Sequence, residues 1–169
     1  MVPYLAVQLF GGLRPFEAAR LRWERIHFET MQIEILGETS KTRETRFVQL
    51  EPLLAEWLLP FRLPKGRITG PFFASTLRAV KVSAGFTFSA DGDRPWPKDV
   101  LRHCYGSYWL AVHKNRAHLA ELMGTSLAMI KSHYKRAIPG EVAKEFWKLT
   151  LKPDAPGKII DITQSCKVG

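Results

Sequence analysis

The 169-residue chain has few cysteines and no long apolar segment. Cys104 and Cys166 are the only cysteines, too few for a disulfide scaffold, and this favours a reducing, cytoplasmic setting. A run of about eighteen uncharged apolar residues, as a transmembrane helix requires, does not occur. The N-terminal residues also lack the basic segment before an apolar one that is typical of a signal peptide. We therefore expect no membrane partner.

Motifs for metal binding and for nucleotide hydrolysis are also missing. The five histidines do not occur in the paired short spacings of a zinc site, and two cysteines cannot complete a closed one. The sequence has neither a glycine-rich phosphate loop ending in Lys-Ser or Lys-Thr nor a Gly-x-Ser-x-Gly segment. A metal centre, a nucleotide-hydrolysing motor and a serine hydrolase are therefore disfavoured, and no cofactor is expected.

Positive charge, in contrast, is abundant and unevenly distributed. The chain has 25 Lys and Arg residues against 16 Asp and Glu residues, a formal net charge of +9. Residues 61–136 contain 13 of the basic and 4 of the acidic residues, so the whole excess lies in this stretch. Localised basic charge is typical of proteins with a polyanion partner, most often nucleic acid. A basic surface without any ligand gives the same pattern, and charge alone does not separate the two.

Hydrophobic residues make up 46% of the chain, enough to fill the core of one domain. Periodicity and turn residues predict helices over residues 4–13, 15–21, 53–59, 73–84, 99–113, 117–123, 126–137 and 141–149. Alternation of apolar and polar residues predicts a strand over residues 31–36, and residues 47–50 are its expected partner across a polar hairpin, with 23–28 as a candidate third strand. The expected fold is therefore mainly α with a small antiparallel β-sheet, an α+β arrangement.

The ends of the expected domain follow from composition. Residues 1–150 are expected to form the domain, because the sequence becomes polar and irregular after Pro153. Residues 151–169 are expected to be an extended or mobile C-terminal tail. Within the domain, the spacing of Leu101, Tyr105, Tyr108 and Val112 predicts the buried face of one helix.

Three side chains have positions that need an explanation. Arg14 lies between two expected helices and three residues before Glu17, which fits either a structural ion pair or an anion clamp at a helix N-terminus. Arg102 lies at the edge of an apolar helix face, where a guanidinium group needs a partner. Tyr134 ends a helix among the basic residues of 131–136. A helical tyrosine usually belongs to the core, but cations around it also suit a bound anion.

Several short motifs become informative through their order and spacing. Gly-Leu-Arg-Pro-x-Glu at 12–17 precedes Ser-Lys-Thr in the expected hairpin, and Leu-Arg-His at 101–103 follows. Met-Gly-Thr-Ser at 123–126 then precedes Tyr134, which lies nine residues after the threonine. Taken together, residues from about 10 to 147 resemble the catalytic domain of tyrosine recombinases, the phage-integrase family.

The resemblance implies a specific chemistry. In that family a tyrosine attacks a DNA phosphodiester and holds it as a 3′-phosphotyrosine, which conserves the bond energy for resealing. Tyr134 would be this nucleophile, Arg14 and Arg102 would stabilise charge on the non-bridging oxygens, and Lys41 would protonate the leaving 5′-oxygen. We expect these four side chains to converge on one basic concave face. The implied partner is double-stranded DNA in the cytoplasm, at the nucleoid, with self-association on DNA left open.

Two positions depart from the family pattern. The family usually has His three residues before the second Arg, where this chain has Asp99. It usually has His or Trp directly after the Gly of the later motif, where this chain has Thr125. Asp99 is a candidate acceptor for the phenol proton, and Thr125 a candidate donor to a phosphate oxygen. Because acid–base catalysis contributes about 10²–10⁴-fold, these replacements predict a slow enzyme rather than an inactive one.

The sequence leaves three functions open. The first is a site-specific recombinase or integrase that cleaves and rejoins DNA. The second is a catalytically degenerate, DNA-binding remnant of an integrase that retains the phosphate-gripping arginines. The third is a structural domain whose basic surface meets no nucleic acid. Because members of the family usually carry an N-terminal helical domain that binds the core DNA site, we expect this chain to be a catalytic domain that lacks it.

Overall fold

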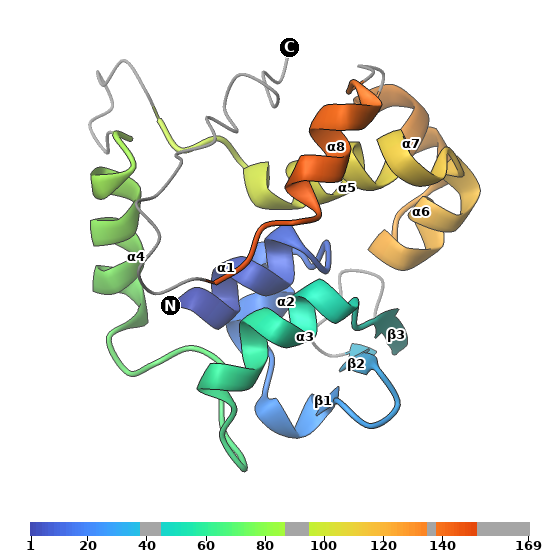
Figure 1. Ribbon diagram of the computed structural model, residues 1–169. Coiled ribbons are helices and arrows are strands. Elements are labelled where there is room, and N and C mark those ends of the chain that lie inside the picture. The colour runs from blue at the N-terminus through green and yellow to red at the C-terminus, as the bar shows by residue number, and fades with distance from the viewer. Residues whose placement is uncertain (38–44, 87–94, 135–137, 152–169) are drawn as a thin grey trace.

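The computed structural model describes residues 1–37, 45–86, 95–134 and 138–151, and these form a mainly helical fold with one small sheet (Figure 1). The α-helices are α1 (Val2–Leu9), α2 (Pro15–Arg20), α3 (Pro52–Leu58), α4 (Phe73–Ser83), α5 (Val100–His113), α6 (Arg116–Met123), α7 (Leu127–His133) and α8 (Gly140–Phe146). This confirms the expected α+β class. No helix in the described ranges is long and apolar enough to cross a membrane. The expected tail, after Leu151, lies outside the described residues.

The sheet has three antiparallel strands in the order β1 (Ile26–His27), β2 (Gln32–Ile35) and β3 (Arg46–Gln49). Ile33 pairs with Val48, and both side chains are buried. Strand alternation therefore turns one face of the sheet toward the helices. The candidate third strand is shorter than expected.

That shortening has a local cause. The chain forms a 3-10 helix, η1 (Trp23–Arg25), before β1, and the N–H of Arg25 donates to the carbonyl of Arg22. Only Ile26 and His27 then remain to pair with β2. Another 3-10 helix, η3 (Leu59–Phe61), follows α3 directly.

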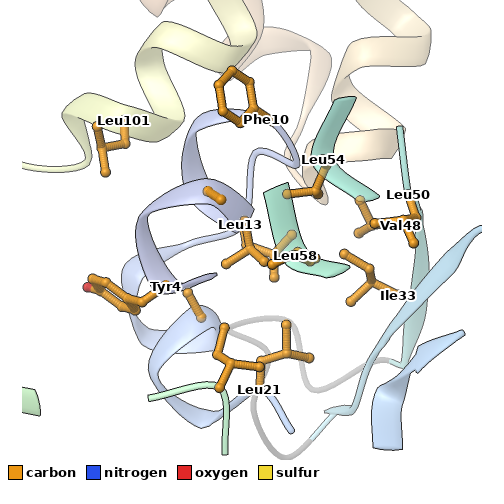
Figure 2. Close-up of a cluster of buried hydrophobic side chains, with 14 of the residues drawn as sticks. Tyr4, Phe10, Leu13, Leu21, Ile33, Val48, Leu50, Leu54, Leu58 and Leu101 are labelled. Atoms are coloured by element: carbon orange, nitrogen blue, oxygen red, sulfur yellow. The ribbon is translucent and has the colours of Figure 1, made fainter. Parts of the chain in front are cut away.

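The main core lies where α1, α3 and α5 meet the inner face of the sheet. Its buried side chains include Tyr4, Phe10, Leu13, Leu21, Ile33, Val48, Leu50, Leu54, Leu58 and Leu101 (Figure 2). A second cluster joins α5 to the α6–α7 pair through Tyr105, Trp109, Leu119, Met123 and Ile130. The ring of Tyr108 stacks on that of Phe146, with centroids 4.0 Å apart, and thereby holds α8 against α5.

Two expectations need correction. The first helix ends at Leu9 rather than at residue 13, because the chain turns at Gly12 with a left-handed φ of 65°. The ring of Tyr105 lies where a side chain at this glycine would stand, only 2.4 Å from an ideal Cβ. Val112 is not buried: it is 43% exposed in the last turn of α5, where it lines an open groove beside Trp109.

Candidate functional site

The first part of the site is the joint between α1 and α2. Arg14 has extended backbone angles (φ −69°, ψ 148°) and Pro15 begins α2, so the chain enters the helix with a preset φ. Glu17, one turn into α2, accepts from the backbone N–H and from Nη1 of Arg14, both at 2.9 Å. The structural ion pair considered for Arg14 is therefore present.

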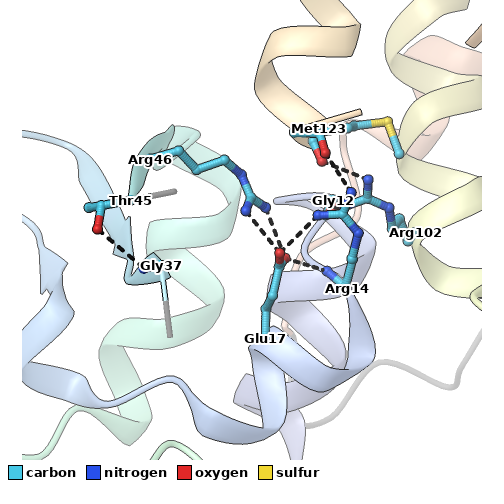
Figure 3. A network of polar contacts seen from close by, with 9 residues as sticks. Gly12, Arg14, Glu17, Gly37, Thr45, Arg46, Arg102 and Met123 are labelled. Carbon is cyan, nitrogen blue, oxygen red and sulfur yellow. Dashed lines mark hydrogen bonds and ion pairs between the residues drawn. The ribbon is translucent and has the colours of Figure 1, made fainter. Parts of the chain in front are cut away.

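Glu17 also binds Arg46, the first residue of β3. The two terminal guanidinium nitrogens of Arg46, Nη1 and Nη2, donate to the two carboxylate oxygens of Glu17, each at 2.8 Å (Figure 3). The Glu17 side chain is only 1% exposed. Burial opposes its ionisation, but the hydrogen bonds and charges of Arg46 and Arg14 outweigh burial and lower its pKa. Glu17 is therefore a carboxylate at neutral pH.

The second part of the site is the α6–α7 turn, where both predicted phosphate-binding arginines meet. Arg102, on α5, is buried and donates to the carbonyls of Gly12 (2.5 Å) and Met123 (2.6 Å). Arg14 donates to the carbonyl of Gly124 at 2.5 Å. Burial, together with the nearby Arg14 charge, lowers the pKa of Arg102 to about 10. The arginines that the sequence predicts to converge do so on consecutive carbonyls.

Tyr134 lies against the same helix that bears Arg102. Tyr134 directly follows the last residue of α7, His133. The helix expected over residues 126–137 therefore stops earlier than predicted, and residues 135–137 lie outside the described part. An ideal Cβ on Gly106 would stand 2.5 Å from Cε1 of Tyr134, so the phenol ring rests on the α5 backbone at this glycine. Tyr134 is 8% exposed.

A histidine without a sequence-assigned role accompanies this tyrosine. The His103 ring centroid lies 5.4 Å from that of Tyr134 and 6.1 Å from that of His133. Burial lowers the pKa of His103; the Asp99 charge opposes the shift, while His133 and Arg102 add to it. The imidazole is therefore neutral at physiological pH, the form that accepts a proton.

The other residues predicted for the site are Asp99, Thr125 and Lys41. Asp99 precedes α5 with a left-handed φ of 55°, and its carbonyl accepts from the N–H of His103 at 2.9 Å. Thr125 follows Gly124 in the α6–α7 turn and is half-buried, and its N–H donates to the carbonyl of Ala120. Lys41 lies outside the described residues. The expectation of a single concave face including Lys41 therefore stays a prediction.

Arg46 was missed at the sequence level, although strand alternation offers a signal. Residues two apart in a strand share a face, and Arg46 stands two residues before buried Val48, whereas the intervening Phe47 is 57% exposed. An arginine in phase with the buried face of a strand predicts a buried anionic partner. That partner is Glu17, from a helix 29 residues earlier.

The cluster formed by Arg14, Glu17, Arg46 and Arg102 is electropositive, because it holds three guanidinium groups and one carboxylate, which binds Arg14 and Arg46. Each guanidinium has five N–H donors, and the bonds described for Arg14 and Arg102 use two side-chain nitrogens of each. Such a cluster attracts an oxyanion. Within the described ranges, no group of three His, Cys, Asp or Glu side chains is suited to hold a metal ion.

Comparisons of this chain with protein-family models, with curated proteins and with solved structures found no match. The chemistry of the arginine cluster, of Tyr134 and of His103 is therefore the basis for assigning a function.

Proposed function

We propose that this chain is the catalytic domain of a DNA strand-transfer enzyme of the tyrosine recombinase type. The observation that carries the proposal is the meeting of Arg14 and Arg102 on adjacent carbonyls of the α6–α7 turn, with Tyr134 following from α7. Residues far apart in the sequence contribute to one cationic cluster and one adjacent phenol. This combination suits a nucleophile that attacks a phosphodiester.

The proposed reaction is a transesterification. The Tyr134 oxygen bonds to phosphorus as the bond to the 5′-oxygen breaks, so the DNA is held as a 3′-phosphotyrosine and a free 5′-hydroxyl is released. Arg14 and Arg102 stabilise the charge that develops on the non-bridging oxygens. The leaving oxygen takes up a proton, and Lys41 stays the predicted donor. Attack by a 5′-hydroxyl reverses the step and reseals a strand.

His103 is the proposed acceptor of the phenol proton. Its ring contacts that of Tyr134, and its lowered pKa keeps it neutral near pH 7. Asp99, the residue first considered for this role, acts one step away, because its charge favours the protonated form of His103. Cleavage is thus expected to fall as pH drops through the lowered His103 pKa, and replacing His103 with Gln is expected to remove this dependence.

A suicide substrate tests the proposal. Duplex DNA with a nick near the cleavage site loses a short fragment after attack, so a covalent adduct accumulates and shifts the protein on a denaturing gel. The wild-type chain should form the adduct. Tyr134→Phe should form none while its duplex affinity stays nearly unchanged, and Tyr4→Phe, a buried control, should behave as the wild type. Absence of a wild-type adduct, with no gain from Asp99→His or Thr125→His, would reject the enzyme.

A non-catalytic DNA-binding protein is the second candidate. It is favoured by the 7% exposure of Arg102 and by its two bonds to carbonyls, which give this side chain a structural role independent of DNA. Such a protein would bind duplex DNA with a steep salt dependence but would form no adduct. The same nicked substrate separates the two candidates, because binding and adduct formation are scored in one experiment.

A further inference from the structure

A groove of about 570 Å³ lies between α2, the segment that precedes α4, and the first residue of α4. Two arginines line it: Arg20, the last residue of α2, and Arg67. The other lining residues are uncharged, so the groove has basic side chains and no carboxylate in its wall. None of these residues belongs to the arginine cluster.

The backbone holds the two sides of this groove together. Arg22 and Arg67 form an antiparallel bridge, the N–H of Ile68 donates to the carbonyl of Leu21 at 3.0 Å, and the N–H of Trp23 donates to the carbonyl of Gly66 at 2.9 Å. The side chain of Ile68 is buried. Arg67 is therefore placed beside the end of α2 by the fold rather than by chance contact of a surface loop.

These two arginines differ from most others in their ion pairing. Five arginines in the described part of the chain have a carboxylate within 4 Å: Arg14, Arg22, Arg25, Arg46 and Arg62. Arg20 and Arg67 form no ion pair with a carboxylate in the described part of the chain. The Arg20 guanidinium instead lies 3.4 Å from the centroid of the Phe16 ring, and Phe16 is 54% exposed. Stacking on the ring orients the guanidinium plane and leaves its N–H edge for an anion.

We propose that this groove binds the phosphodiester backbone of duplex DNA, at a position beside the arginine cluster. The proposal rests on the DNA partner of the proposed function but not on its chemistry. Helix α2 joins the two sites: Arg14 precedes its first residue and Arg20 is its last. Six residues of helix span about 9 Å, which corresponds to about three base pairs of a duplex. The two sites are therefore close enough along the helix for one DNA segment to span the distance between them.

The test compares the salt dependence of duplex binding in two variants of equal charge. Arg20→Gln with Arg67→Gln removes the groove cations, and Lys114→Gln with Arg116→Gln removes two exposed cations elsewhere. The slope of log affinity against log salt should fall by about 2 in the groove variant, about 1 for each lost phosphate contact, and stay unchanged in the control. The control variant should form the tyrosine adduct at the wild-type rate.

Each outcome has a defined meaning. Equal slopes of log affinity against log salt in the groove variant and the wild type would overturn the proposal that the groove binds DNA. They would not affect the proposed enzymatic function. A reduced slope in a chain that forms no adduct would support the groove and reject the enzyme. If the wild type does not bind duplex DNA, both proposals fail. Inorganic phosphate, titrated against the wild type and the groove variant, is the remaining arm: tight phosphate binding that the groove variant loses, together with equal duplex slopes, would make the groove a small-anion site and overturn the proposal.

Discussion

Arg14 precedes the first turn of α2 and Arg20 ends its last, but the two guanidinium groups have different surroundings. Arg14 is bonded to Glu17 and to the carbonyl of Gly124, with 19% of its side chain exposed. Arg20 lies on an exposed phenyl ring and has no carboxylate partner in the described part of the chain. One short helix therefore links a cation bound into the fold to one that faces solvent.

The difference shows what each site can contribute. Removing one member of a buried ion pair leaves the other charge uncompensated and is strongly destabilising. An exposed cation contributes little to folding, so its charge is available for a partner. We therefore expect the cluster to contribute strongly to stability and the groove cations to contribute little, and the following changes test this difference in order of decreasing effect.

The largest effect is expected for Glu17→Gln. The neutral amide leaves Arg14 and Arg46 without their shared carboxylate in a site where that side chain is 1% exposed. Stability in urea should fall by about 3–5 kcal/mol, the usual range for breaking a buried pair. Glu24→Gln is the matched control, because this carboxylate pairs with exposed Arg22. A loss in the control as large as that for Glu17→Gln would remove the distinction between buried and exposed pairs.

Gly106→Ala tests how closely the Tyr134 ring packs against the backbone of α5. Alanine normally stabilises a helix relative to glycine, but here its Cβ would approach Cε1 of Tyr134 to 2.5 Å. We expect a net loss of about 1–3 kcal/mol, typical of overpacking, and a reduced adduct yield. Gly140→Ala is the control, since nothing lies within 4 Å of its ideal Cβ in α8. That variant should be neutral or slightly more stable when both are unfolded in urea.

The acid dependence of stability gives a smaller effect with a defined sign. Glu17 has a lowered pKa in the folded protein, so the unfolded chain binds its proton first as pH falls below the ordinary value of 4.5. Stability is therefore lost as pH falls from 4.5 through the folded pKa, by about 1.4 kcal/mol for each pH unit between the two values. Urea titrations should show the wild type approaching Glu17→Gln over this range. A constant difference between the two proteins would contradict the ionised network.

The smallest effect on stability is expected for the groove variant. Arg20→Gln with Arg67→Gln removes exposed side chains and leaves the backbone bonds between residues 21–23 and 66–68 in place. The unfolding free energy should stay within about 0.5 kcal/mol of the wild-type value. A loss comparable to that of Glu17→Gln, measured in the same urea experiment, would mean that the groove arginines also support the fold.

Local signals in the sequence were sufficient for most of the fold. Pro15 marks the start of α2, and period-2 alternation predicted the strand over residues 31–36 that contains β2. The partner strand, predicted over residues 47–50, is β3 at Arg46–Gln49. The Arg14–Glu17 ion pair also follows from spacing, because both residues lie at one helix start. These features depend on neighbours a few residues apart, which is the range over which propensity and capping act.

The long-range parts of the site could not be predicted in this way. Spacing within α5 shows that Arg102 needs a partner, but the acceptors are carbonyls of Gly12 and Met123, which the sequence does not single out. The approach of His103 to Tyr134 likewise depends on how α7 packs on α5. Backbone acceptors carry no residue-type signal, so contacts to them emerge only from the tertiary fold.

The bonds from Arg14 and Arg102 to the α6–α7 turn also constrain the order in which the site can form during synthesis. A nascent chain that has emerged as far as residue 115 contains both arginines, but the carbonyls of Met123 and Gly124 are still to be added. Until α6 and the turn after it pack against α5, the guanidinium groups of Arg14 and Arg102 lack these carbonyl acceptors. Assembly of the arginine cluster with its carbonyl acceptors is thus a late event in biogenesis, completed only when the last quarter of the described chain packs onto its first residues.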